Sequence, residues 1–314
     1  MTVLIVLTLL FGTVFALMFE SYRRAIGQAR LRVATGSSIV QTSCGPIEYA
    51  EVGEGQPILL VHGAGGGYDQ GLDLGAPLAR RGFRIVAMSR FGYLRTPLPV
   101  DASAAAQADA HAALLDALKI ERTAVMGASA GGPSAMQFAL RHADRCSALV
   151  LLVPAAYVPR AGGGPSVRTP ARTTFLFGTA LKSDLLFWLA LRFLRSTAIR
   201  SILGTPPALV DHASADERAR VAEVLQHVLP VSSRRLGLLN DAAVISSLRR
   251  YDLERIAVPT LAISAADDLY GTFDGARYTA DHIPYARFLG YPTGGHLCVG
   301  HQDAVATEIA AFLK

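Results

Sequence analysis

A serine set between very small residues is the stretch of this chain best suited to chemistry. The sequence Gly-Ala-Ser-Ala-Gly at residues 127–131 follows directly on an apolar run at residues 123–126. A serine exposed on a sharp strand-to-helix turn needs such small residues two positions before and after it, because strand and helix approach each other closely there. Residues 133–142 are predicted to form a helix whose N-terminal amides favour negative charge at the serine oxygen. The pattern predicts that Ser129 is a nucleophile, with an ordinary glycine-rich loop as the alternative.

An acid and a histidine that could activate this serine follow near the C-terminus. A serine hydroxyl is a poor nucleophile at neutral pH until an imidazole removes its proton, and that imidazole needs a carboxylate to hold its tautomer. The predicted strand at residues 258–263 runs into a loop with two adjacent acids, Asp267 and Asp268, and His296 follows two glycines in another loop. The chain order is therefore serine, acid, histidine, and the interval between the acid and the histidine suits one helix and one strand.

Alternating strand and helix patterns would position these residues. Continuous apolar runs predict strands that are buried on both faces, and their alternation with helices predicts a parallel sheet. The predicted strands are residues 58–61, 84–88, 123–126, 148–153, 258–263 and 286–289, and the predicted helices include residues 102–118 and 133–142. A predicted hairpin precedes them at residues 39–42 and 47–52. We therefore expect a doubly wound α/β fold with a mostly parallel sheet.

The alternation stops at Pro154, and a long helix-like region follows a Gly- and Pro-rich stretch at residues 159–170. An insertion at this place predicts a helical cap, at about residues 156–250, over the strand ends where open α/β sheets bind ligands. Residues 185–191 are apolar on nearly every face. Their helix could line an acyl pocket, dip into a membrane surface or lie buried against the core. The predicted cap helices include residues 183–194 and 215–227.

The N-terminal segment is predicted to be a separate unit that spans a membrane. Residues 2–19 carry no charged side chain and are near the lower limit, roughly 17 residues, for crossing a bilayer as a helix. The basic residues that follow are Arg23, Arg24, Arg30 and Arg32. Since Lys and Arg favour the cytoplasmic flank of a membrane helix, we expect a single-pass anchor in the plasma or inner membrane, with the catalytic body in the cytoplasm.

Two other interpretations of this segment stay open, a cleaved signal peptide and a buried helix. A signal peptide would need a positive charge before the apolar run and a small-residue cleavage site after it, but residues 1–2 carry no charged side chain and Glu20 follows at once. A polar stretch at residues 28–38 is predicted to be a connector. The expected organisation is an anchor and connector at residues 1–35 and a catalytic domain, including the cap, at residues 36–314.

Composition excludes several other classes of protein. Of the 314 residues, 51% are hydrophobic and 18% are charged, which rules out a disordered chain. The net charge of +5 arises mostly from scattered arginines without a basic run interleaved with aromatics, so no nucleic-acid partner is expected. Three widely spaced cysteines suit a reducing compartment and offer neither a disulfide framework nor a metal site. The glycines at 63–67 lack the Lys-Ser/Thr ending of a phosphate-binding loop, and no cofactor is expected.

Over residues 39–314 these motifs together resemble those of the α/β-hydrolase family. The matching pieces are His62-Gly63 after a predicted strand, the serine pentapeptide, Pro259-Thr260-Leu261 ahead of the paired acids, and Gly294-Gly295-His296. In members with two acids after Pro-Thr-Leu, the second belongs to the triad, so the resemblance implies Asp268 as the partner of Ser129 and His296. Asp267 is then a loop residue, although an exchange of the two roles stays open.

The resemblance also implies how an oxyanion would be bound and which branches of the family fit. Two backbone amides would donate to it, those of Ala130 and Ala64, while His62 would hold the loop. A serine nucleophile disfavours the dehalogenase and epoxide-hydrolase branches, which use Asp at that position. Residues 89–93, Ser-Arg-Phe-Gly-Tyr, replace the commoner Asp-x-Arg-Gly-x-Gly of the family, so the subfamily stays open.

The expected activity is that of a carboxylesterase-like serine hydrolase whose substrate is a small apolar or lipid-like ester. Two alternatives keep the same fold: an acyltransferase or carbon-carbon hydrolase that uses the same triad, and a ligand-binding protein that does not turn over.

Overall fold

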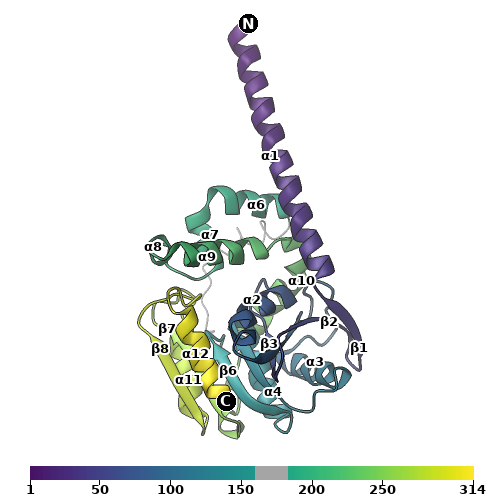
Figure 1. Ribbon diagram of the computed structural model, residues 1–314, viewed down its shortest axis with the longest axis vertical. Coiled ribbons are helices and arrows are strands. Elements are labelled where there is room, and N and C mark those ends of the chain that lie inside the picture. Colours follow the sequence, from purple (N-terminus) through teal and green to yellow (C-terminus); the bar gives the residue numbers. More distant parts are fainter. Residues whose placement is uncertain (160–182) are drawn as a thin grey trace.

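Eight strands form one sheet in the computed structural model, which describes residues 1–159 and 183–314. Their order across the sheet is β1-β2-β4-β3-β5-β6-β7-β8 (Figure 1). The strands are β1 Ser38–Thr42, β2 Gly45–Val52, β3 Gln56–Val61, β4 Phe83–Met88, β5 Thr123–Ala128, β6 Cys146–Leu152, β7 Thr260–Ala265 and β8 Ala286–Tyr291. From β4 to β8 all neighbours are parallel, while β2 pairs antiparallel with β1 and β4. The doubly wound, mostly parallel sheet is therefore as predicted.

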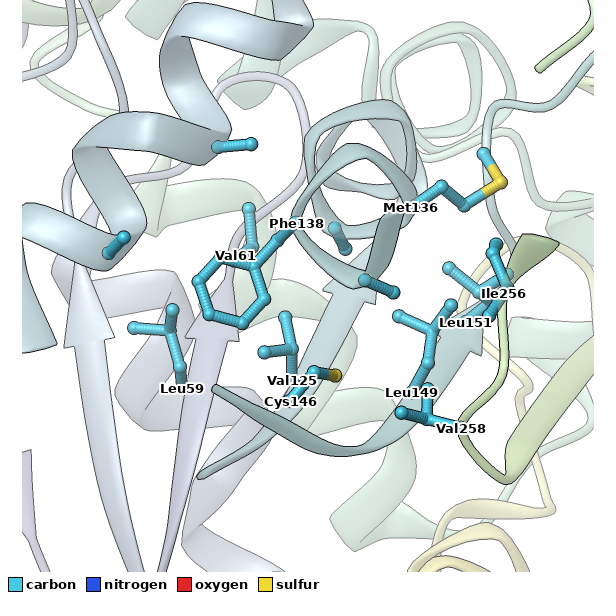
Figure 2. Close-up of a cluster of buried hydrophobic side chains, with 14 of the residues drawn as sticks. Leu59, Val61, Val125, Met136, Phe138, Cys146, Leu149, Leu151, Ile256 and Val258 are labelled. Carbon is cyan, nitrogen blue, oxygen red and sulfur yellow. The ribbon is translucent and has the colours of Figure 1, made fainter. Parts of the chain in front are cut away.

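Helices cover both faces of this sheet, because its central strands are apolar on both sides. One core cluster joins the strands to α3, α4 and α11, and a second joins the opposite face to α2 and α12. These helices are α2 Tyr68–Ala79, α3 Ala104–Ala117, α4 Gly132–Arg141, α11 Thr272–His282 and α12 Gln302–Leu313. Figure 2 shows Met136 and Phe138 of α4 packed over strand residues that include Val61, Val125 and Leu151. This packing fixes α4 against the end of β5, where the candidate nucleophile lies.

Helix α2 is an element that the sequence patterns did not predict. It contains Gly71, Gly75 and Pro77, which all weaken a helix in isolation. The two glycines allow a close approach to β4, since a Cβ atom at Gly71 would lie 2.7 Å from Cβ of Ala87, and one at Gly75 would lie 2.6 Å from Cγ2 of Ile85. Tertiary packing therefore outweighs local propensity here.

The chain begins with one long helix, α1 Thr2–Thr35. Most of the segment expected to be a connector, residues 28–38, is helical, because α1 continues to Thr35 and ends at Gly36. Ile26 and Ala29, in the lower part of α1 after Phe19, are buried against the cap, which explains why this part stays helical. An 18-residue window of α1 has a mean hydropathy of 2.5 and none of it is buried. By length and composition α1 could cross a membrane, and a signal sequence would meet the same criterion.

Between β6 and β7 the described chain forms helices above the sheet (Figure 1). They are α6 Asp184–Phe193, α7 Arg195–Ile202, α8 Pro207–Asp211, α9 Ala215–His227 and α10 Arg235–Ser246. The helices predicted at residues 183–194 and 215–227 correspond to α6 and α9. Most of the predicted Gly- and Pro-rich stretch at residues 159–170 lies outside the described residues. The cap therefore stands over the carboxyl ends of the strands, at the edge of the sheet where Ser129 follows β5.

Candidate active site

Ser129 lies on a strained turn between β5 and α4. Its φ angle is +50°, in the left-handed region that a residue with a side chain rarely adopts. The turn requires the two flanking glycines: a Cβ atom at Gly127 would lie 2.6 Å from Cβ of Ala135, and one at Gly131 would lie 2.3 Å from the carbonyl oxygen of Val61. This is the close strand-helix approach expected from the spacing of the pentapeptide. The serine oxygen is thereby presented above the carboxyl end of β5, beside the N-terminus of α4.

The structure brings Ser129, His296 and Asp268 together from three separate loops. Nε2 of His296 lies 2.9 Å from Oγ of Ser129, and Nδ1 lies 2.7 Å from Oδ2 of Asp268. When Nδ1 carries the ring proton and donates it to the carboxylate, Nε2 is free to accept the serine proton. Asp268 is fully buried and His296 nearly so. The arrangement can therefore deprotonate the serine as it attacks a carbonyl carbon.

The environment of Asp268 keeps its carboxyl group ionised. Burial alone would raise the pKa of this group, but the attraction and hydrogen bond of His296 outweigh burial. The hydroxyl of Thr272 also donates to Asp268, and so does the Tyr270 amide, at 2.8 Å. Together these partners hold the pKa of Asp268 below its usual range. An ionised Asp268 can orient His296 and stabilise its charged form.

The two adjacent acids occupy different positions. Asp267 does not bind the imidazole; its Oδ1 accepts the amide of Gly295 at 2.7 Å, directly before His296. Gly295 has a φ angle of +61°, a conformation that favours glycine. Asp268 therefore contacts the imidazole itself, while Asp267 holds the backbone of the loop that carries it.

The loop after β3 lies directly against the serine. A Cβ atom at Gly63 would be 3.1 Å from Cβ of Ser129. The amide of Gly63 donates to Oε1 of Gln70 at 2.8 Å, whereas the amide of Ala64 has no hydrogen-bond acceptor among the described residues. Ala64 is exposed, and Ala130 follows the serine in a short 3₁₀ turn that leads into α4. These two amides are the ones that the family resemblance assigns to oxyanion binding.

A buried network around His62 holds this loop, and its other members, Arg90 and Asp241, were not predicted from the sequence. Burial and the nearby charge of Arg90 lower the pKa of His62 well below the ordinary value, which favours its neutral form. Arg90 donates to the carbonyl oxygens of His62 and Gly63 at 2.9 and 3.2 Å, and its amide donates to Nε2 of His62 at 3.0 Å. Its guanidinium also pairs with both carboxylate oxygens of Asp241, at 2.6 and 2.7 Å. The loop is therefore tied to α10 of the cap.

Tyr93 completes this network. Its hydroxyl donates to Asp241 and accepts the amide of Gly65 at 3.2 Å. Arg90 and Tyr93 belong to residues 89–93, the stretch that departs from the family pattern. Asp241 carries no local motif, so no sequence signal could have linked it to Arg90 and Tyr93, which precede it by 151 and 148 positions.

A second buried ionic cluster joins the same loop to the N-terminal helix. Arg234, fully buried, donates to Asp69 at 2.6 and 3.1 Å and to the carbonyl oxygen of Gly66 at 2.5 Å. Arg32, near the end of α1, donates to the same carboxylate and to the carbonyl oxygen of Leu229 at 2.7 Å. Burial alone would raise the pKa of Asp69, but the two guanidinium groups lower it below the usual range. Arg32, interpreted from sequence only as a membrane-flanking charge, thus contacts the body directly.

The cap also contacts the loops that carry the acid and the histidine. The ring of Tyr270 stands edge-on to that of His296, with centroids 4.8 Å apart. Its hydroxyl donates to the carbonyl oxygens of Ser201 and Ile202 at 3.0 and 2.9 Å. The carbonyl oxygen of Gly204 accepts the amide of His296 at 3.3 Å. The end of α7 and the residues after it therefore fix the position of the histidine.

Cys298, two residues beyond His296, is buried, and burial raises its pKa to about 12. It is therefore a protonated packing residue and not a candidate nucleophile. Within the described residues, no group of three or more His, Cys, Asp or Glu side chains is arranged to hold a metal ion.

Comparison with known proteins agrees with this architecture. A family model described as alpha/beta hydrolase fold matches residues 56–197. An alpha/beta hydrolase fold protein from Nakamurella multipartita, of known structure, has a TM-score of 0.70 at 28% identity, covering 88% of this chain and 98% of that one. The Bacillus subtilis protein called uncharacterized hydrolase YcgS is 26% identical over 276 residues, 84% of this chain and 92% of that protein. A 2-hydroxy-6-oxo-6-phenylhexa-2,4-dienoate hydrolase from Comamonas testosteroni is 31% identical over 113 residues, 34% of this chain and 40% of that protein.

Proposed function

We propose that this chain, which has the α/β-hydrolase fold, hydrolyses a carboxylic ester through a covalent acyl-enzyme. One observation carries the proposal: an unbroken hydrogen-bonded chain from Oγ of Ser129 through both ring nitrogens of His296 to the ionised Asp268. Such a chain supplies what a serine lacks at neutral pH, a base that is held in the correct tautomer.

The proposed reaction has two halves. Oγ of Ser129 attacks the ester carbonyl carbon as Nε2 of His296 takes the hydroxyl proton, and the amides of Ala64 and Ala130 donate to the oxyanion. Collapse of the tetrahedral intermediate breaks the bond to the alkoxide, which leaves with the proton from His296. A water molecule then gives a proton to His296 and attacks the acyl group, and the carboxylic acid departs as Ser129 regains its proton.

Hydrolysis of a carbon-carbon bond is the second candidate. The observation that favours it is the matching segment of the Comamonas testosteroni protein, whose name describes a dienoate hydrolase. The same serine and histidine would serve that reaction, but its leaving group is a carbanion that must also be stabilised. Transfer of the acyl group to an alcohol uses the first half of the ester reaction and differs only in the acceptor.

We also propose that α1 anchors the protein in the plasma or inner membrane, with the catalytic body in the cytoplasm. In support, the first part of the helix is exposed and uncharged, and Arg23 and Arg24 follow it. An anchored hydrolase fits a small apolar or lipid-like ester as substrate, since such esters partition into membranes.

The experiment is a comparison of the full chain with Ser129→Ala on a panel of p-nitrophenyl esters of increasing acyl length. Wild-type turnover and its loss in the variant, with an unchanged circular-dichroism spectrum, are expected. Unchanged ester turnover by Ser129→Ala would contradict the proposal. Product analysis with water and an alcohol in competition separates hydrolysis from transfer, and a dienoate substrate tests carbon-carbon cleavage.

A further inference from the structure

Helix α6 is apolar on two opposite faces, and only one of them is covered within the described residues. Phe187 and Trp188 are buried in a cluster with α1 and the segment before α10. On the other side Leu185 and Leu186 are 37% and 46% exposed, and Phe193, two turns later, is 62% exposed. Leu194, just after the helix, is 56% exposed. We call these four residues the outer face of α6. A soluble cap would ordinarily place polar side chains there.

The position of α6 along α1 indicates what covers this face. The uncharged part of α1 ends at Phe19, and Glu20 is the first charged residue. Helix α6 meets α1 just beyond this boundary: the rings of Tyr22 and Trp188 make an edge-to-face contact with centroids 5.7 Å apart, and Ile26 lies in the same cluster. Figure 1 shows α6 lying across α1 rather than along it. If α1 spans a bilayer, α6 lies level with the bilayer surface and in its plane.

The charges around α6 match an anionic lipid surface. Arg192, in the last turn of α6, and Arg195, at the start of α7, are exposed. Arg23 and Arg24 on α1 are exposed as well, and Arg24 pairs with Glu20. Basic side chains beside an apolar helical face are typical of helices that lie in the headgroup region with their apolar face in the acyl boundary. Aromatic residues such as Tyr22 and Trp188 are enriched at the same depth.

We propose that the outer face of α6 is a second membrane contact, seated in the headgroup-acyl boundary of the anionic bilayer that α1 crosses. This inference rests on the proposed membrane anchor and adds to it a lipid-bound cap. From α6 the chain passes through α7 to Gly204, whose carbonyl oxygen accepts the amide of His296. The lipid-seated part of the cap is thus joined to the histidine loop through the short helix α7. The substrates favoured by this arrangement are esters dissolved in the membrane.

The single tryptophan of the chain makes the position of α6 measurable. In a Trp188→Phe background, one new tryptophan is introduced by Phe193→Trp on the outer face, by Phe11→Trp in the middle of the uncharged part of α1, or by Tyr285→Trp. Tyr285 is 69% exposed and directly precedes β8, so it lies at the amino end of that strand, whereas the cap stands over the carboxyl ends. It is therefore the matched aqueous control. Each full chain is reconstituted in vesicles of equal parts phosphatidylcholine and phosphatidylglycerol, and its fluorescence is quenched by acrylamide or by lipids doxyl-labelled near the headgroup or deep in the acyl chain.

The expected result is that the Phe193→Trp chain is quenched most by the shallow doxyl lipid and is severalfold less sensitive to acrylamide than the Tyr285→Trp chain. The Phe11→Trp chain should be quenched most by the deep doxyl lipid. If Phe11→Trp reports a deep position while Phe193→Trp behaves like Tyr285→Trp, the inference about α6 is wrong and the anchor stands. If neither is quenched by lipid, both fail, and labelling of Ser129 by a fluorophosphonate in the same vesicles still tests the hydrolase proposal separately.

A functional arm uses Leu186→Glu and Phe193→Glu, with Tyr285→Glu as the matched control. On a long-chain ester dispersed in the vesicles, the two outer-face variants should lose turnover severalfold, mainly through a higher apparent KM. On a short, water-soluble ester all three should match the wild type, which also shows that the variants are folded. Equal loss on both substrates, or no loss on the vesicle substrate, would contradict the proposed lipid contact.

Discussion

Asp241 of the cap and Arg90 of the core form a bidentate ion pair that is buried on both sides, at 2.6 and 2.7 Å. Arg90 also donates to the carbonyl oxygens of His62 and Gly63, which begin the loop beside Ser129. The cap is therefore ionically coupled to the loop that carries the amide of Ala64.

Breaking this pair should cost both stability and activity. Asp241→Asn leaves a buried guanidinium without its counter-charge, which we expect to lower the free energy of unfolding by about 3 to 5 kcal/mol. The turnover number should fall as well, since the loop loses its support. Chemical denaturation and ester kinetics measure the two effects. Asp252→Asn, in an exposed pair with Arg255, is the control and should change little. Equal behaviour of the two variants would contradict the coupling.

The two adjacent acids should differ in kinetic effect. Asp268→Asn removes the carboxylate that orients His296, and we expect kcat to fall by about 10⁴-fold. Asp267→Asn weakens only the hold on the Gly295 amide, so its loss of kcat should be much smaller. Steady-state kinetics on one ester compares them directly. If Asp267→Asn were the more damaging change, the assigned roles would have to be exchanged.

Acid should destabilise the fold partly through Asp69. Its pKa is lower in the folded chain than the ordinary value, since Arg234 and Arg32 outweigh burial. The stability that it contributes is therefore complete above the unfolded-state pKa, about 4, and is lost as the pH falls through the lower folded-state value. Asp69→Asn should be less stable than the wild type at neutral pH and lose less stability on acidification. Thermal unfolding at a series of pH values tests this, with the exposed Asp281→Asn as control; a pH profile of Asp69→Asn parallel to that of the wild type would speak against it.

The lower part of α1 should be needed for folding as well as for attachment. A chain that begins at residue 18 keeps Tyr22, Ile26 and Arg32, whereas one that begins at residue 36 loses these contacts and exposes Trp188. We expect the first truncation to be soluble and folded in mild detergent and the second to unfold at a markedly lower temperature or to aggregate. Size-exclusion chromatography and thermal unfolding measure the difference. Equal stability of the two would show that α1 contributes only the anchor.

The sequence predicted the features whose cause is local. The turn at Ser129 could be predicted because it needs small neighbouring residues. The central strands could be predicted because burial on both faces makes their sequences continuously apolar. Helix α2 could not be predicted. Gly71 and Gly75 lower its local helix propensity, and they support the helix only because they let it pack closely against β4. The same holds for residues 28–35, which stay helical because Ala29 is buried in the cap cluster and Arg32 binds Asp69 and the carbonyl oxygen of Leu229. Arg90, Asp241 and Arg234 act through partners far away in the sequence, and no spacing rule reaches that far.

The central claim is that Ser129 is the nucleophile of an acyl-transfer reaction, and covalent trapping tests it most directly. The full chain is treated with a fluorophosphonate, digested, and the modified residue is identified by mass spectrometry. We predict a single phosphonyl adduct on Ser129 in the wild type, a much slower reaction in His296→Ala, and no adduct in Ser129→Ala. An unmodified Ser129 in a chain that turns over ester, or an equal adduct in His296→Ala, would contradict the account.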